Sequence, residues 1–586
     1  MDRIKQLIRQ HWIALLLAFI IGVLVVSPTL VSIRKLTPNT FKGIYPMFND
    51  DEDVYLTMTR EAYDGHTNLS NAYIKDYKAG PYLQPPLPEV VYSGIAKVLH
   101  VSVATEAVVN DFFTPLISFL ILYSLIWMQT KSKKISLALS SLFFLFFLGS
   151  FGRPINPQFG FIFLLLGFQC IWIIATNTFP KKKIILWNLA LAGCFGVLVY
   201  AYPFYWMTLG VVYTVWTLSI ALKEKEWRYW LTNWLWFFIP AGICTLPFLY
   251  NAKLLASSPF FIEANERFGF LATHFPGSYF QIILIILCFP LAFAVWKLNQ
   301  KYLSNIVLFA PALILSGIIL NWQNIITGKT LQFPPHFYPV MVLFIFLIAS
   351  VTIHTVCREG VRRLWSIICV TTLVLLCIII GNRQKGEAIA VIRNIYKPVD
   401  ITKLQDIGRV TQWLSQNTPP DSAVYALGEN YFWAIPIYTS DNLYFAPNAS
   451  LTMMSDLELE NRWAIQHFFD DETESRVTQA SREIWANKFI DSYQNKEVRR
   501  KILELITRKQ YPENILMDES YPKRVFQIYK KNKEMGFEKA LKTYSVDYIL
   551  LDNSDKRYTS LEEKFNSFSF IKEVARFGDT IIYKIK

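Results

Sequence analysis

Charge and cysteine are both scarce in this sequence. Of its 586 residues, 18% are charged and 53% are hydrophobic. A soluble domain is closer to about 25% charged, so this balance excludes an ordinary cytosolic enzyme. All seven cysteines lie in or beside apolar runs. The polar segments therefore hold no disulfide framework and no CxxC metal pair, which excludes a disulfide-rich secreted protein.

A basic stripe is also missing, although the net charge is +13. Residues 385–586 carry 29 Lys and Arg against 29 Asp and Glu, so the whole excess belongs to residues 1–384. In the apolar part of a chain, basic residues set membrane topology. With no nucleic-acid-binding motif beside it, this distribution excludes nucleic acid as a partner.

Long apolar runs dominate residues 1–384. Runs of this length predict membrane spans, and we expect about eleven of them, at 12–31, 112–128, 135–150, 158–176, 184–200, 204–222, 230–250, 279–297, 304–321, 337–355 and 364–381. The first run is too long for the apolar part of a signal peptide and has no evident cleavage site. The fold class is therefore a polytopic α-helical membrane protein.

Alternate short connections are basic, with 17 Lys and Arg on one side when Arg3, Lys5 and Arg9 are included. The positive-inside rule places that side and the N-terminus in the cytoplasm. It places the first loop (32–111) and the C-terminal region outside, as in a multi-pass protein of the plasma (inner) membrane. The spans hold almost no ionisable side chain, His354 being the main exception. This argues against a coupled transporter, which needs charged groups near the midplane.

The first loop carries an acidic run, Asp50-Asp51-Glu52-Asp53, followed by an apolar pattern that predicts a short helix ending at Gly65. One interpretation is a helix cap, because acids favour the positive end of a helix. Four consecutive acids exceed that need, since like charges repel. The other interpretation is a catalytic or cation-binding cluster.

A proline-rich segment follows, with Pro85, Pro86, Leu87 and Pro88 ahead of a second predicted helix at the membrane surface. Together with Asp51-Glu52, Tyr55 and Arg60-Glu61, this segment resembles the polyprenyl-phosphate-sugar-dependent membrane glycosyltransferases of the GT-C fold. The likeness is to the group of protein O-mannosyltransferases and the lipid A aminoarabinose transferase. Residues 40–110 carry the motif, and the span layout extends the resemblance to about residue 380.

One feature departs from the aminoarabinose transferase. There an acid and a lysine precede the two prolines, whereas this chain has Leu83 and Gln84. In this chain, the donor contacts of that acid and lysine are made by other residues, such as Asp76, Lys78 or Glu89, or they are absent. The sugar and the acceptor are therefore not transferable from that relative.

The resemblance implies transfer of a sugar from a polyprenyl-phosphate carrier at the outer side of the bilayer, with inversion. A carboxylate then accepts the proton of the attacking hydroxyl. The resemblance assigns the role of general base to Asp51 and makes Glu52 a second catalytic carboxyl residue. Contacts with sugar or acceptor fall to Asp53, Tyr55, Arg60 and Glu89. The one cofactor considered is a divalent cation, Mg²⁺ or Mn²⁺, at Asp51 and Asp53.

The leaving phosphate needs cationic partners near the outer interface. The expected partners are Arg153, Arg267, Lys329 and His336. Each has another interpretation: Arg153 as an interfacial anchor, Arg267 as the partner of a neighbouring acid, and His336 as a structural residue at the mouth of a span.

Residues 385–586 return to soluble composition and predict an α/β domain outside the membrane, after a transmembrane domain over 1–384. We expect a helix at 402–416, strands at 423–427 and 548–551, and a hairpin at 568–585. The domain has no phosphate loop and no nucleophile elbow, so recognition of the acceptor or capping of the site is its expected role. Asn68 and Asn448 stand in glycosylation sequons, a motif common by chance.

The sequence thus predicts a membrane glycosyltransferase that transfers a hexose, with mannose as first choice, to a lipid, glycan or protein acceptor. A transporter or lipid-linked glycan flippase without transferase activity is the alternative. A ligase or polymerase of lipid-linked glycans would need a large outer loop late in the chain, whereas here the largest loop is the first.

Overall fold

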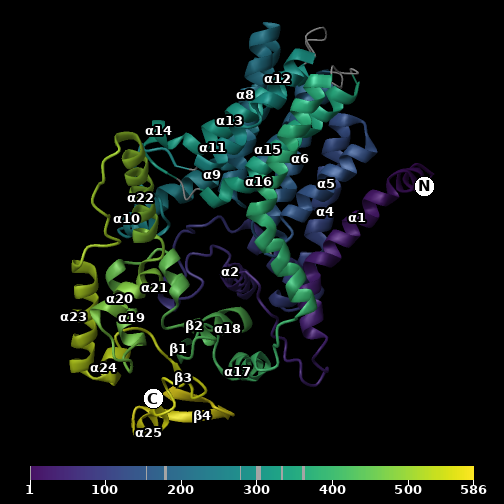
Figure 1. Cartoon of the computed structure of the whole chain (residues 1–586). Coiled ribbons are helices and arrows are strands. Elements are labelled where there is room, and N and C mark those ends of the chain that lie inside the picture. The colour runs from purple at the N-terminus through teal and green to yellow at the C-terminus, as the bar shows by residue number, and fades with distance from the viewer. Residues whose placement is uncertain are drawn as a thin grey trace. The chain divides into compact units, whose positions relative to one another are not determined.

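The computed structural model of the chain describes residues 2–49, 51–153, 155–176, 181–277, 279–298, 305–330, 334–358 and 363–586. Asp50 of the acidic run, and Lys301 and Arg362 of the basic connections, lie outside the described residues. The chain forms two compact units (Figure 1). The helical unit comprises Met1–Ser32, Ala107–Tyr250 and Thr273–Val399, and the α/β unit comprises Ile33–Glu106, Asn251–Ala272 and Asp400–Lys586. The segments of the two units thus alternate along the sequence, whereas the sequence analysis predicts one domain boundary near residue 384.

The helical unit consists of apolar helices and short connecting turns. Its elements are α1 (Asp2–Ile33), α4 (Val103–Thr130), α5 (Lys133–Phe146), η2 (Ser150–Gly152), α6 (Gln158–Thr176), α7 (Lys181–Val199), α8 (Pro203–Glu224), α9 (Trp227–Ala256), α11 (Tyr279–Ile286), α12 (Phe289–Leu298), η4 (Asn305–Leu308), α13 (Phe309–Trp322), α14 (Asn324–Thr327), α15 (Pro334–Arg358) and α16 (Arg363–Tyr396).

Within the described residues, nine helices are long and apolar enough to cross a membrane. This confirms a polytopic helical membrane protein, but not all eleven predicted spans reach that length. At about 1.5 Å per residue, the 14 residues of α5 extend roughly 21 Å, short of a bilayer core of about 30 Å. The apolar stretch of α7, Lys183–Val199, is also too short to count.

Burial separates central from peripheral helices in this unit. In its most apolar window, α15 is 78% buried inside the protein, whereas α9 and α16 are each only 17% buried. An apolar helix that is buried all round belongs to a core, and one with exposed apolar faces suits a lipid environment. The α15 helix therefore forms the centre of the unit, while α9 and α16 present apolar surface to the bilayer.

The start of α4 corrects one expectation from the sequence. The helix begins at Val103 rather than near residue 112, so that its apolar stretch includes Glu106 and Asp111. Both acids are buried, and Gln158 Nε2 donates to Asp111 Oδ1 at 3.3 Å. The spans are therefore less free of ionisable groups than predicted.

The α/β unit joins the first loop to the C-terminal region. Its elements are α2 (Glu52–Asp64), η1 (Lys75–Tyr77), α3 (Leu87–Leu99), α10 (Phe261–Arg267), α17 (Leu404–Asn417), β1 (Ala423–Leu427), α18 (Tyr431–Tyr438), β2 (Asn442–Leu443), η5 (Pro447–Leu451), α19 (Asp456–Gln466), α20 (Glu474–Gln479), α21 (Ser481–Trp485), α22 (Lys488–Thr507), α23 (Ser520–Met535), α24 (Phe537–Leu541), β3 (Tyr548–Asp552), α25 (Leu561–Asn566), β4 (Ile571–Phe577) and β5 (Thr580–Ile585).

A five-stranded sheet of order β2-β1-β3-β5-β4 organises this unit. The β1 strand pairs in parallel with β2 and β3, with Val424 opposite Tyr548, and β5 runs antiparallel to β3 and β4. The predicted helix at 402–416, the two predicted strands and the closing hairpin are confirmed. Gly578 turns the hairpin with a positive φ of 58°.

Alternate residues of the central strands enter different cores, as the period of a strand requires. Val424 and Leu550 pack with residues of α17 and α18, and with Met58 and Ala62 of α2. Tyr425 and Leu551 pack on the other side with residues of α19, α21 and α23. The helix that follows the acidic run is therefore built into one face of the sheet.

Arg462 of α19 joins the first loop to the C-terminal region from a buried position. Its guanidinium donates to Glu458 at 2.8 Å, to the Tyr444 carbonyl at 2.8 Å and to Asp76 of the first loop at 3.0 Å. It also lies 4.0 Å from the centre of the Tyr544 ring. A buried cation is tolerated only with such partners, so this residue makes the two segments interdependent.

We predict that Arg462→Met destabilises the protein by about 3–5 kcal/mol, because the buried guanidinium is lost and the partly buried Glu458 carboxylate loses its ion-pair partner. Arg557→Met is the matched control. Arg557 pairs with Asp555 and Glu429 at the surface, where such pairs contribute about 0–1 kcal/mol. Thermal unfolding of both variants in detergent measures the difference, and equal losses would contradict the structural role given to Arg462.

Candidate functional site

The described acids of the run occupy three different environments at the start of α2. Asp51 holds the N-cap position but makes no side-chain cap bond, and it is exposed. Glu52 is buried and Asp53 is partly buried. The helix ends as predicted at Gly65, which has a φ of +114°. Asp51 thus lies where the cap interpretation predicts, but its carboxylate does not form the hydrogen bond of a helix cap.

Glu52 is held against the preceding loop. Its Oε2 accepts the Phe48 N–H at 3.0 Å, and only 8% of the residue is exposed. Burial, with a smaller contribution from the charge of Asp53, raises the pKa of Glu52 to about 8. Near neutral pH this carboxyl is therefore largely protonated.

Asp53 connects the first loop to the C-terminal region. Its Oδ1 accepts the Val54 N–H at 2.8 Å, and its Oδ2 accepts Asn448 Nδ2 at 2.9 Å. Burial raises the pKa of Asp53 to about 6, against the effect of these hydrogen bonds. Asn448 was visible in the sequence only as a sequon. Because its amide nitrogen is bonded to Asp53, it contributes here to the acidic site.

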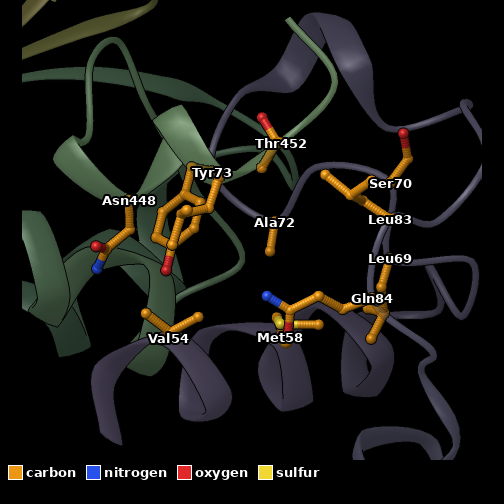
Figure 2. A pocket seen from close by; sticks show the side chains of 11 residues that line it. Val54, Met58, Leu69, Ser70, Ala72, Tyr73, Leu83, Gln84, Asn448 and Thr452 are labelled. Atoms are coloured by element: carbon orange, nitrogen blue, oxygen red, sulfur yellow. The ribbon is translucent and has the colours of Figure 1, made fainter. Parts of the chain in front are cut away.

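A small cavity lies beside these groups (Figure 2). Val54 and Met58 of α2 line one side of it, and Tyr73 and Thr452 line the opposite side. Its volume of about 20 Å³ admits about one water molecule, far below the roughly 300–1,000 Å³ of a small-molecule pocket. The cavity is therefore not the sugar site.

Two buried hydroxyls accompany this cavity. Tyr73 Oη and Thr57 Oγ1 are both buried, and the Tyr73 hydroxyl has Thr57 and Asn448 as its hydrogen-bonding neighbours. Burial raises the pKa of Tyr73 well above its ordinary value, and the charge of Asp53 contributes. Together with Asn448, these hydroxyls make the surroundings of Asp53 polar, although most of the side chains that line the cavity are apolar. The sequence held no signal for them.

Leu83 and Gln84, the two positions that depart from the aminoarabinose transferase, line the same cavity. Two of the residues considered as substitutes are engaged elsewhere. Asp76 accepts from Arg462, and Lys78 lies 2.6 Å from Glu61 Oε2 and 2.8 Å from Asp421 Oδ1. The remaining one, Glu89, is buried at the first turn of α3.

The Arg60-Glu61 pair of the motif does not act as a pair. Arg60 Nε donates to Asp64 at 2.8 Å, and its guanidinium lies over the Tyr63 ring. Glu61 is instead buried beside Lys78 and His66. Tyr55, one turn into α2, is also buried. The Glu61 and Tyr55 side chains of the motif are thus buried, and Arg60 lies nearer the surface.

Arg267 does not have the environment expected of a phosphate ligand. It is fully buried, forms an ion pair with Asp456, and donates to the carbonyls of Ser450, Thr452 and Met454. A phosphate would have to displace these bonds. The structure corrects the phosphate-binding prediction in favour of the alternative interpretation, although the acid is Asp456 of the C-terminal region and not a neighbour in the sequence.

The other three predicted phosphate ligands belong to the helical unit. His336 Nδ1 is 2.6 Å from Tyr202 Oη, and the imidazole stacks on Phe204 with ring centres 4.4 Å apart. Arg153 is partly buried, and its charge acts on His336. Lys329 is exposed just after α14. Arg153 and His336 thus lie in one electrostatic environment, and their binding of phosphate stays a prediction.

No protein-family model matches this chain, and no curated protein matches its sequence. Similar solved structures include ArnT from Cupriavidus metallidurans bound to undecaprenyl phosphate, with 11% identity and a TM-score of 0.48, covering 98% of each chain. The same protein in the apo state has 10% identity and a TM-score of 0.45, covering 100% of this chain and 98% of that one.

A third similar structure is the archaeal oligosaccharyltransferase AglB from Archaeoglobus fulgidus, in complex with an inhibitory peptide and a dolichol-phosphate. It has 11% identity and a TM-score of 0.43, covering 83% of this chain and 71% of that one. The likeness is distant and concerns the course of the chain, not individual residues.

We predict that Glu52→Gln flattens the pH dependence of stability. The pKa of about 8 in the folded protein exceeds the ordinary value of 4.5, so the folded state keeps a proton that the unfolded state releases. This contribution is complete below about pH 4.5 and is lost towards pH 8, by up to about 1.4 kcal/mol per pH unit.

Thermal unfolding in detergent between pH 5 and 8 measures this effect. The Tm of the wild type should fall more steeply than that of Glu52→Gln. Glu429→Gln, at an exposed carboxylate, serves as the control and should follow the wild type. Parallel curves for all three proteins would contradict the assigned environment of Glu52.

Proposed function

We propose that this protein is a membrane glycosyltransferase that takes a sugar from a polyprenyl-phosphate carrier and transfers it to a hydroxyl acceptor. The observation that carries the proposal is the start of α2. There an exposed carboxylate, Asp51, adjoins two carboxyls whose pKa burial raises, Glu52 and Asp53. Perturbed carboxyls grouped at one helix end favour a functional site over a structural one.

In the proposed mechanism Asp51 is the general base. Of the described acids in the run, it is the exposed one, so a bulky acceptor can reach it. Its carboxylate accepts the proton of the acceptor hydroxyl as the oxygen attacks the anomeric carbon. The bond to the carrier phosphate breaks on the opposite face of the sugar, and the configuration inverts.

Glu52 and Asp53 support this base by position. Glu52 anchors the loop before α2 through Phe48, and Asp53 is fixed by Asn448. A site held by such bonds keeps its geometry during the reaction. Asn448 therefore gives the C-terminal region a direct part in the site, alongside the recognition of acceptor predicted for it.

Mg²⁺ or Mn²⁺ at Asp51 and Asp53 remains a prediction. In the described ranges these two carboxylates do not converge with a third His, Cys, Asp or Glu ligand atom within 4.8 Å. Both Asp53 oxygens already accept hydrogen bonds. We therefore assign catalysis of the sugar transfer to the general base, Asp51.

The leaving phosphate is assigned to Arg153 and His336, with Lys329 as a further cation. A guanidinium and an imidazole can donate hydrogen bonds to phosphate oxygens and stabilise the charge that develops there. For the transferred group we propose a hexose, mannose being the first to test. The acceptor is a lipid, a glycan or a protein.

Transport of a lipid-linked glycan is the second candidate. The observation in its favour is the pair of buried acids on α4, Glu106 and Asp111, because ionisable groups buried in a membrane helix often mark a translocation path. Such a protein would bind the carrier lipid without consuming the sugar bond.

We predict that Asp51→Asn lowers sugar transfer by about two orders of magnitude or more while the protein stays folded, because the amide cannot accept the proton. Purified protein in lipid would receive radiolabelled polyprenyl-phosphate hexoses together with a crude lipid and glycan acceptor fraction. Asp579→Asn, at an exposed turn, is the matched control and should transfer like the wild type. Equal transfer by Asp51→Asn would reject it as the base, and an intact donor with every protein would favour transport.

We also propose that the N-terminus is cytoplasmic and that residues 400–586 lie outside the plasma membrane. In a chain whose native cysteines are replaced by alanine, Ser560→Cys should react with a membrane-impermeant maleimide in intact cells. Lys134→Cys, on a basic connection, should react only after permeabilisation. Both positions are exposed. The reverse pattern of labelling would invert the proposed topology.

A further inference from the structure

Three potential metal ligands converge in the turn between α19 and α20, away from the acids of α2 in the sequence. They are His467, Asp470 and Glu472, and their ligand atoms all lie within 4.8 Å of one another. His467 Nδ1 is 2.6 Å from Asp470 Oδ2 and 3.5 Å from Glu472 Oε1. In the described part of the chain, this is the one group of three such side chains at that spacing.

Glu472 points to a ligand independently of this convergence. Its side chain is only 4% exposed, and its Oε2 forms no hydrogen bond with any described group. The nearest arginine, Arg476, lies 4.0 Å away and is 43% exposed, so it compensates the buried charge poorly. A buried carboxylate oxygen without a donor calls for a cation.

The far side of the imidazole faces a carboxylate and an aromatic ring. Glu483 Oε2 lies 4.0 Å from His467 Nε2 and accepts the Trp463 indole N–H at 3.3 Å. The Trp463 ring lies 4.5 Å from the imidazole. The separation of 4.0 Å is longer than a hydrogen bond, whereas Nδ1 forms a hydrogen bond with Asp470 Oδ2 at 2.6 Å. A metal ion bound at Nδ1 would replace the proton of that bond.

We propose that His467 Nδ1, Asp470 and Glu472 bind a divalent transition-metal ion, Zn²⁺ or Mn²⁺, with water completing the coordination. One imidazole and two carboxylates form a mixed nitrogen and oxygen donor set, which suits these ions better than Ca²⁺ or Mg²⁺. The site is separate from the Mg²⁺ or Mn²⁺ considered at Asp51 and Asp53.

The surroundings assign the ion a structural role. The Asp470 carbonyl accepts the hydroxyl of Tyr529 from α23, and the carbonyls of Ile465 and Gln466 accept the hydroxyl of Tyr425 from β1. The turn that holds the ligands is thus bonded to α23, and the end of α19 just before the turn is bonded to the sheet. A bound ion would stabilise this packing, because it binds the folded chain and not the unfolded one.

Isothermal titration of the EDTA-treated full chain in detergent, free of affinity tags, tests the site with ZnCl₂ and MnCl₂. We expect one site per chain beyond any that is retained in Glu472→Gln, and a Tm higher by about 5 °C or more at saturation. Asp51→Asn should keep this site, which separates it from the acids of α2.

Glu472→Gln keeps the size of the side chain and removes a buried charge, so it should still unfold cooperatively. We expect it and Asp470→Asn to weaken binding at least about tenfold and to abolish the Tm shift. Asp471→Asn, an exposed neighbour in the same turn, should bind like the wild type. Absence of binding to the wild type, or equal binding by folded Glu472→Gln, would overturn the proposal.

Discussion

The α/β unit depends on the pairing of charges that folding removes from water. A buried ion needs several partners to offset its desolvation, and the partners used here come from distant parts of the chain. Arg462 reaches back to Asp76 of the first loop, Lys78 of that loop reaches Asp421, and Arg267 reaches Asp456. The first loop is therefore a part of the C-terminal domain in structural terms, although some 300 residues of mostly membrane helix separate them.

The same fold also determines the acid–base properties of the carboxyls at the start of α2. Three neighbouring carboxyls begin with similar intrinsic acidity, and the fold places one in solvent, one in the interior and one against Asn448. Because desolvation penalises the charged form, the interior carboxyl of Glu52 and the partly buried carboxyl of Asp53 hold their protons more strongly. Neutralising them in part also reduces the repulsion that four adjacent acids would otherwise suffer. A cluster that looks costly in the sequence thereby becomes tolerable in the fold.

The helical unit obeys a different constraint. In a bilayer every backbone polar group must find its partner within the protein, so the segments that cross it are helices. Buried polar side chains also link helices there: Asn188 of α7 accepts from Tyr213 of α8 at 2.7 Å and donates to Asn233 of α9 at 3.0 Å. Such bonds hold the short α7 between two longer helices. A helix too short to span the bilayer can thus still belong to the packed unit.

Local pattern determined much of this protein. Apolar runs predicted the helices of the membrane part, and alternation with turn residues predicted α2 up to Gly65, both central strands and the closing hairpin, because these features depend on neighbours in the sequence. Only the tertiary structure decided which acid of the run is exposed, that Asn448 joins the acids, and that Arg267 is a buried structural residue. It also decided that His467, Asp470 and Glu472 converge around an unsatisfied carboxylate oxygen. Burial, pKa and hydrogen-bond partners depend on residues far away in the chain, and no local pattern carries that information.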